Sequence, residues 1–187
     1  MRDKADLLGT PIKLIACGGN GLDMSWNQTV INGCASLVDY ISVHNYDDAG
    51  EYKSGPSDYD GFLTTLAAYI ASSANPDLKI YNSEWNLQTT DWRTGLYAGG
   101  ILNVFERHGE NFEIGGPALF LRHTSASAWD NAFINFDHTG WFPAPNYVVM
   151  KLWHDHRGPN RIETTGTDTN LNVTTLMSED EQTLYIH

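Results

Sequence analysis

The sequence predicts an α/β fold built from about four strand–helix units. Short apolar runs rich in β-branched and aromatic residues alternate with longer stretches whose apolar residues recur at helical spacing. Strands that alternate with helices form a parallel sheet. After Gly158 the composition becomes Thr-rich and broken by turn residues, which indicates antiparallel strands. We therefore expect two domains, residues 1–158 and residues 159–187.

Each element has its own signal in the chain. Strands are expected where β-branched and aromatic residues cluster, at residues 12–18, 38–46, 77–85 and 112–121. Helices are expected where apolar side chains recur every three or four positions, at residues 25–37, 58–74, 92–110 and 146–158. Asp58 or Asp60 is expected to cap the second helix. Leu96, among others, is expected on the apolar stripe of the third helix, and Gly158 is expected to end the fourth.

Four parallel strands fit either an open doubly wound sheet or half of a barrel. The doubly wound fold predicts a glycine-rich phosphate turn after the first strand, and "ACGGNG" lacks the required spacing. The barrel predicts polar residues at the carboxyl ends of the strands. Such residues follow the second, third and fourth strands, at 44–46, 84–86 and 122–123. The barrel is therefore favoured.

Composition and charge limit the classes of molecule that the protein is expected to bind. The 187 residues are 41% hydrophobic and 18% charged, which is typical of a globular protein. A formal net charge of −12 disfavours nucleic acid and anionic membrane surfaces, and no apolar run is long enough for a membrane span. The two cysteines lack metal-ligand spacing, so no metal and no cofactor are expected. The 6 Trp and 9 Tyr suit a sugar-binding cleft, although core packing explains most single aromatics.

Glu84 is the candidate chemical group. It follows the apolar start of the third strand, between Ser83 and Trp85. A carboxylate at that place is a nucleophile, a general base, a metal ligand or a structural partner of an arginine. His44 and Tyr46 lie two apart on the preceding strand and so face one side. A donor such as Tyr46 would favour the ionised form of Glu84.

Four stretches carry a family resemblance: "DLLGTPIKLIACGGNG", "VDYISVHNY", "KIYNSEWN" and "SAWDNAFINFDHTGWFPAPNYVVMKLW". They resemble the second half of a clan A glycoside hydrolase, most closely family 51, the α-L-arabinofuranosidases. The resemblance implies the second half of a (β/α)8 TIM barrel, followed by the first strands of an antiparallel β-sandwich. It also implies retaining hydrolysis of α-L-arabinofuranosides of plant cell-wall polysaccharide by two glutamates.

The resemblance assigns roles to individual residues. Glu84 matches the nucleophile. His44 and Tyr46 match a pair that shapes the sugar subsite, with the Tyr hydroxyl donating to the nucleophile. Trp85 and Asn86 are expected to line the same pocket, and Trp129 matches an aromatic residue that borders the cleft.

The chain departs from the family pattern in two places. The acid/base glutamate of the family follows an Asn, and this sequence has no Asn–Glu pair. Retaining hydrolysis needs two carboxyl groups roughly 5 Å apart. A missing N-terminal half or a second chain is therefore expected to supply the acid/base. Arg122 and His123 stand where some members carry an amide, and Arg122 is expected to pair with a site carboxylate or a substrate hydroxyl.

Three alternatives remain open. The chain could belong to a xylosidase or endoglucanase of the same clan. It could be a non-catalytic, carbohydrate-binding half-barrel. Two copies could also close one barrel as a homo-oligomer, because a half-barrel leaves two sheet edges exposed. The sequence does not indicate a cellular compartment.

Overall fold

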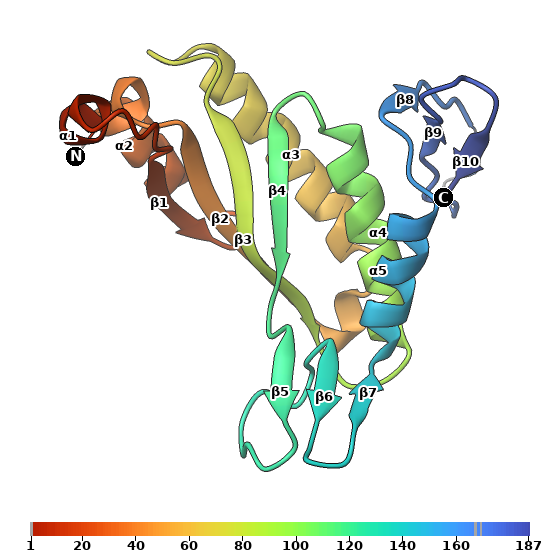
Figure 1. Cartoon of the computed structure of the whole chain (residues 1–187). Helices are drawn as coiled ribbons and strands as arrows, with labels where there is room; N and C mark the ends of the chain where they lie inside the picture. Colours follow the sequence, from red (N-terminus) through yellow and green to blue (C-terminus); the bar gives the residue numbers. More distant parts are fainter. Residues whose placement is uncertain (1, 167, 169) are drawn as a thin grey trace.

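A computed structural model describes residues 2–166, 168 and 170–187 (Figure 1). The helices are α1 Arg2–Leu7, α2 Met24–Cys34, α3 Gly55–Ala71, α4 Arg93–Arg107 and α5 Pro145–Asp155, with 3-10 turns at Ala35–Leu37 and Ala49–Glu51. The strands are β1 Ile15–Asn20, β2 Tyr40–Asp48, β3 Lys79–Gln88, β4 Phe112–Pro117, β5 Leu121–His123, β6 Ile134–Phe136, β7 Trp141–Pro143, β8 Asn160–Ile162, β9 Thr175–Met177 and β10 Leu184–Ile186. None of these described helices is long and apolar enough to cross a membrane.

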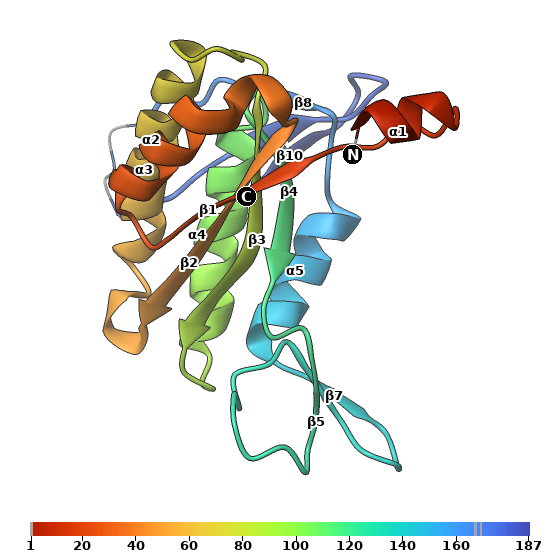
Figure 2. The same ribbon diagram turned by 90° about the vertical axis from the view of Figure 1, so that its left-hand side faces the viewer.

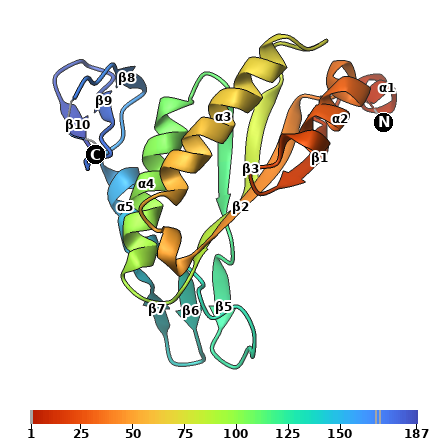
Figure 3. The ribbon, with the colours of Figure 1, turned by 180° about the vertical axis from the view of Figure 1, so that it is seen from behind.

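The strands form three sheets. The largest is parallel, in the order β1-β2-β3-β4. Helices α3 and α4 lie behind it in Figure 1 and in front of it in Figure 3, so they cover one face. Among the described residues, no helix lies over β2, β3 and β4 on the opposite face, which we call the open face. The sheet of β5, β6 and β7 lies beyond the carboxyl ends of the parallel strands (Figures 1 and 2).

The core lies between the parallel sheet and its helices. Ile41 and Val43 of β2 and Ile80 of β3 are fully buried there. They belong to one cluster with the apolar stripes of α3 and α4, represented by Leu66 and Ile101. Burial of this apolar surface is the main favourable term in folding and fixes which strand face meets the helices.

The predicted α/β fold with four parallel strands is confirmed, with local corrections. The predicted strand 112–121 is two strands, β4 and β5, in different sheets, and two strands that were not predicted, β6 and β7, follow before α5. The stripe predicted for α4 is wrong at Leu96, which is 55% exposed. Helix α5 ends at Asp155, before Gly158, because Gly158 already lies against β9, where an added Cβ would meet the Met177 carbonyl oxygen.

The predicted caps of α3 are also wrong. The helix begins at Gly55, and Pro56 in its first turn needs no amide hydrogen there. Asp58 therefore lies in the first turn rather than at the cap. Asp60 lies deeper in α3, where it binds Arg107, the last residue of α4, and His108, which follows it.

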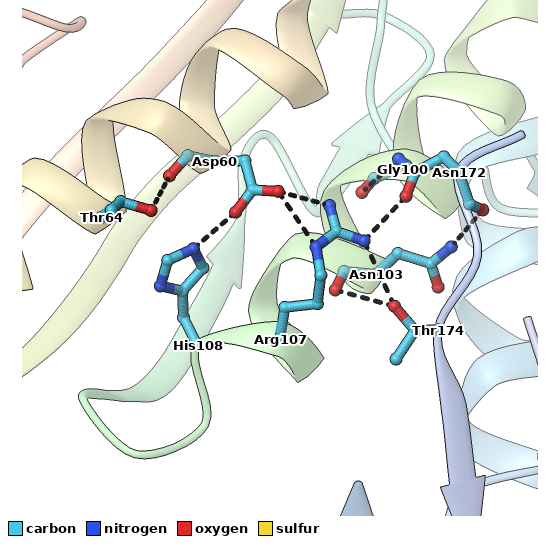
Figure 4. Close-up of polar contacts among 8 residues, drawn as sticks. All are labelled: Asp60, Thr64, Gly100, Asn103, Arg107, His108, Asn172 and Thr174. Atoms are coloured by element: carbon cyan, nitrogen blue, oxygen red, sulfur yellow. Dashed lines mark hydrogen bonds and ion pairs between the residues drawn. The ribbon is translucent and has the colours of Figure 1, made fainter. Parts of the chain in front are cut away.

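A polar junction joins α3, α4 and the segment leading into β9 (Figure 4). Arg107 donates from Nε and Nη2 to Asp60 Oδ2, at 3.0 and 2.8 Å, and His108 Nε2 lies 2.6 Å from Asp60 Oδ1. Arg107 Nη1 also donates to Asn172 Oδ1 at 2.8 Å and to Thr174 Oγ1 at 3.3 Å. One guanidinium thus ties the β8–β10 sheet to the helical layer.

This junction predicts a pH-dependent stability. Burial alone would raise the pKa of Asp60, but the hydrogen bond from His108 and the charge of Arg107 outweigh it and hold the pKa below its usual range. A carboxyl group with a lowered folded pKa stabilises the fold above its unfolded pKa and loses that effect as pH falls. We expect Asp60→Asn to lower the free energy of unfolding at pH 7 by about 1–2 kcal/mol.

Urea unfolding of both proteins measures this prediction. The difference between them should shrink only below the ordinary carboxyl pKa of about 3.9. The exposed Asp3→Asn is the matched control. A difference that stays constant down to about pH 2 would contradict the ion-pair account.

Candidate active site

A β-bulge at Ser83 decides which way Glu84 points. On the β2 side, Asn82 pairs with Val43 and Glu84 pairs with the next residue, His44, so Ser83 is an extra residue in β3. The pairing of β3 with β4 shifts by one residue between Asn82 and Trp85 as well. By strict alternation Glu84 would join Asn82 on the buried face. The bulge reverses the alternation, so Asn82 is 0% exposed whereas the Glu84 side chain is 43% exposed. Glu84 therefore lies beside His44 on the open face.

The structure brings together three of the predicted site residues. Tyr46 Oη donates to Glu84 Oε2 at 2.8 Å, and His44 Nδ1 lies 3.5 Å from the same oxygen. Burial, the hydrogen bond to Glu84 and the Glu84 charge all raise the pKa of Tyr46 above its usual value. The phenol therefore keeps its proton and stays a donor at neutral pH. The hydrogen bond expected from Tyr46 to Glu84 is thus present, and His44, on the same strand as Tyr46, lies beside Glu84.

Trp129 adds an aromatic wall to this cluster. It lies in the loop between β5 and β6, and its ring meets the Tyr46 ring edge to face, with centroids 5.6 Å apart. Trp129 is 51% exposed, which leaves ring surface free for a ligand. Its φ of 58° lies in the left-handed region, which a large side chain rarely adopts.

The structure does not support the expectation that Trp85 lines the pocket. Trp85 is 1% exposed and packs edge to face on Phe105 of α4 and on Phe133, with ring centroids 5.8 and 5.3 Å away. Successive side chains of a strand point to opposite faces. Because Glu84 is on the open face, Trp85 is in the core.

Asn86 also differs from its expected role, since it is 1% exposed. Its Nδ2 donates to the Asn131 carbonyl oxygen at 2.8 Å, and its Oδ1 accepts from Asn146 Nδ2 at 3.3 Å. Asn131 Nδ2 in turn donates to the Leu87 carbonyl oxygen at 2.9 Å. Asn86 thus joins the end of β3 to the segment before β6 and to the start of α5.

Arg122 does not pair with a site carboxylate. Its guanidinium donates to the carbonyl oxygens of Ala126 and Ala128 and to Asn135 Oδ1. Its neighbour His123 contacts Ser125 through Nδ1, at 2.7 Å from the hydroxyl oxygen. Both side chains therefore brace the loop that leads to Trp129.

The residues that the sequence analysis missed are Ser83, Asn131 and Asn146. A bulge leaves no clear mark in a single sequence, although the polar run from Asn82 to Glu84 inside an apolar strand was a hint. Asn131 and Asn146 are 6% and 1% exposed, and buried amides are kept where they complete hydrogen bonds. In the sequence, Asn131 and Asn146 are visible only as polar residues beside apolar neighbours.

Within the described residues, no cluster of three or more His, Cys, Asp or Glu is placed to hold a metal ion. Three other glutamates are engaged elsewhere: Glu113 accepts from Tyr40, Glu106 meets His187, and Glu51 accepts from the Asp48 amide. Within the described part of the chain, Glu84 contacts His44 and Tyr46 and no other charged or hydrogen-bonding side chain. The cluster thus offers one carboxylate, one phenol, one imidazole and one indole face.

Tyr46→Phe tests the hydrogen bond to Glu84. A hydrogen bond to a charged group contributes about 1.5–3 kcal/mol. If Glu84 is the nucleophile that the family resemblance implies, we therefore expect this change to slow its reaction with an activated sugar by roughly 10- to 100-fold. Tyr81→Phe, in the same strand as Glu84, is the matched control. The sugar bound covalently to the protein is measured in samples stopped at successive times. Equal rates for Tyr46→Phe and the unchanged chain would show that the phenol does not support the carboxylate.

Comparison with known proteins finds relatives among the arabinofuranosidases. No family model matches the sequence. An intracellular exo-α-(1→5)-L-arabinofuranosidase of Acetivibrio thermocellus is 32% identical over 95 residues, which cover 43% of this chain and 19% of that protein. The protein of the same name from Halalkalibacterium halodurans matches with the same identity and coverage.

Solved structures extend the likeness to nearly the whole chain. An α-L-arabinofuranosidase from Thermotoga maritima, in complex with arabinose, aligns with a TM-score of 0.81 at 20% identity, over 99% of this chain and 44% of that one. A GH51 arabinofuranosidase from Xanthomonas axonopodis pv. citri aligns with a TM-score of 0.74 at 17% identity, over 95% of this chain and 43% of that one. The chain thus spans about a fifth of the curated relatives and less than half of these structures.

The fold and the relatives define a class: this α/β chain is similar to clan A glycoside hydrolases, which are built on the (β/α)8 barrel. Within that class the resemblance is to family 51, the α-L-arabinofuranosidases, and the resemblance predicted from the sequence motifs is confirmed.

Proposed function

We propose that this chain is the nucleophile-bearing half of a retaining glycoside hydrolase that acts on α-L-arabinofuranosides of plant cell-wall polysaccharide. One observation carries the proposal: Glu84 is exposed on the open face of a parallel sheet and accepts a hydrogen bond from Tyr46. The sequence similarity to two arabinofuranosidases selects the sugar.

The geometry suits attack on an anomeric carbon. Glu84 forms the bond from a carboxylate oxygen to that carbon as the bond to the leaving-group oxygen breaks. Tyr46 donates to Oε2, and His44 on β2 lies beside that same Oε2. The other carboxylate oxygen, Oε1, is therefore free to attack. Trp129 stands beside Tyr46 as an aromatic wall for the sugar. Water then attacks the glycosyl-enzyme, so two inversions give net retention.

A second glutamate must protonate the leaving-group oxygen and later accept a proton from water. We assign it to a complementary N-terminal half of the barrel, on the same gene or on a second chain. The parallel sheet has two edges, β1 and β4, and its open face exposes apolar residues, with Ile15 50% and Ile114 42% exposed. Such edges and such a face favour pairing with further strands. The β8–β10 sheet is proposed as the start of a β-sandwich domain, with the boundary near residue 158.

Reconstitution tests this assignment. The chain is mixed with a separately expressed first half from a family 51 barrel, and hydrolysis of an aryl α-L-arabinofuranoside is followed. Activity from the mixture and from neither part supports the proposal. Sedimentation distinguishes this from a homo-oligomer, in which two copies of this chain would associate without the added half.

A panel of substrates separates the alternative activities. Faster hydrolysis of aryl β-xylosides or β-glucans than of arabinofuranosides would favour a xylosidase or endoglucanase of the clan. Sugar binding without turnover in the reconstituted barrel would favour a non-catalytic carbohydrate-binding half-barrel. We expect the arabinofuranoside to be hydrolysed faster than the other substrates of the panel.

A further inference from the structure

The loop that carries Trp129 is fixed from both ends by groups that do not touch Glu84. We infer that Arg122 is a positioning residue that sets the Trp129 ring over Tyr46 and so shapes the wall of the sugar pocket. This inference rests on the proposed function for its catalytic consequence, but the positioning itself concerns the unliganded protein.

Arg122 holds the loop on its N-terminal side. Nε donates to the Ala128 carbonyl oxygen at 3.3 Å, and Nη2 donates to the Ala126 carbonyl oxygen. The Ala128 carbonyl belongs to the peptide group that joins Ala128 to Trp129. Fixing that carbonyl therefore restricts the rotation of the peptide plane that enters Trp129. The rigid, planar fork of a guanidinium suits such a double contact, whereas a lysine ammonium does not.

Buried amides hold the loop on its C-terminal side. Asn131 lies two residues after Trp129, and it exchanges two hydrogen bonds with the end of β3, one from Asn86 and one to Leu87. Between the two anchors Trp129 adopts its left-handed φ of 58°. A non-glycine residue keeps such a conformation only where its surroundings enforce it. The two anchors supply that constraint.

Arg122 acts on the pocket through one chain of contacts. It fixes the Trp129 loop, Trp129 packs edge to face on Tyr46, and Tyr46 donates to Glu84. Loss of Arg122 is expected to free the indole ring while the hydrogen bond to Glu84 remains. The sugar would then lose a wall rather than a reacting group, so KM should rise about tenfold with kcat changed less than about threefold.

Fluorine NMR of the unliganded chain labelled with 5-fluorotryptophan tests the positioning directly. The chain has 6 Trp, and Trp129→Phe assigns the Trp129 signal by its loss. Arg122→Ala is expected to shift and broaden that signal but to leave the Trp141 signal unchanged, because Trp141 lies on β7, which pairs with β6 and not with β5. Arg122→Lys should give a partial shift.

A matched control isolates the contact that matters. Arg122 also donates to Asn135 Oδ1 at 3.3 Å, and Asn135→Ala removes that strand-to-strand bond while keeping both loop carbonyl contacts. It should leave the Trp129 signal in place. An unchanged Trp129 signal in Arg122→Ala overturns the inference. So does an equal change at Trp141, since Arg122 would then support the whole β5–β7 sheet.

The kinetic readout separates this inference from the proposed function. In the reconstituted enzyme, Arg122→Ala should raise KM, and Arg122→Lys should recover part of the loss. If the unchanged enzyme hydrolyses no arabinofuranoside, the proposed function fails, and the fluorine spectra still decide the positioning. If activity is present but Arg122→Ala lowers kcat and leaves KM unchanged, the positioning account fails alone.

Discussion

Glu84→Gln is expected to lower hydrolysis of an activated aryl α-L-arabinofuranoside by more than about 1,000-fold in the reconstituted enzyme. The amide fills the same space and still accepts the hydrogen bond from Tyr46, but it is neutral and a poor nucleophile. An activated leaving group needs no protonation, so the loss reports attack by Glu84 and not the action of the acid/base. Initial rates of phenolate release measure it.

Two controls make this result specific. Glu163→Gln changes an exposed glutamate away from the site and should leave the rate unchanged. Glu84→Ala opens space for azide, which should restore turnover and give a glycosyl azide of inverted configuration, because one displacement replaces two. If Glu84→Gln keeps more than a tenth of the unchanged rate, another group is the nucleophile.

Trp85→Ala is expected to lower the free energy of unfolding by about 3–5 kcal/mol, the largest stability effect of the predicted changes. Trp85 is fully buried against Phe105 and Phe133, so truncation leaves a cavity between α4 and β3. Its indole nitrogen has no hydrogen-bond partner among the described residues, so the contribution is packing alone. Urea unfolding followed by circular dichroism measures the change.

Trp92→Ala is the matched control, because Trp92 is 62% exposed and its ring packs edge to face with the Tyr52 ring at the surface. A surface truncation of this kind costs less than about 1 kcal/mol. If Trp85→Ala weakened sugar binding and left stability intact, Trp85 would be the pocket residue that the family resemblance implied. The structure predicts the reverse.

Sequence patterns were sufficient to predict the helices and strands whose apolar residues follow one regular spacing. Alternating strand and helix signals located the four parallel strands, because strands such as β2 begin with β-branched and aromatic residues and α3 shows strong helical spacing. The failures fall where tertiary contacts decide. The run at 112–121 is largely apolar, and its sequence does not reveal that β5, after Pro117, lies in a different sheet from β4.

The positions of the site residues at the ends of strands could be predicted, but the directions and contacts of their side chains could not. Glu84, His44 and Tyr46 could be assigned to strand ends, and they do meet. Adjacent residues of one strand cannot both face a pocket, so Glu84 and Trp85 were competing predictions. Only the bulge at Ser83 decides between them, and its presence depends on pairing with both neighbouring strands. Asn86 and Arg122 bind loops whose course no local pattern reveals.

The most direct measurement is to trap the covalent intermediate with a 2-deoxy-2-fluoro arabinofuranosyl donor bearing an activated leaving group, and to map the modified peptide by mass spectrometry. The account predicts one fluorosugar per chain, attached to the side chain of Glu84, and no attachment in Glu84→Gln. Attachment to any other residue, or equal attachment in Glu84→Gln, would contradict it.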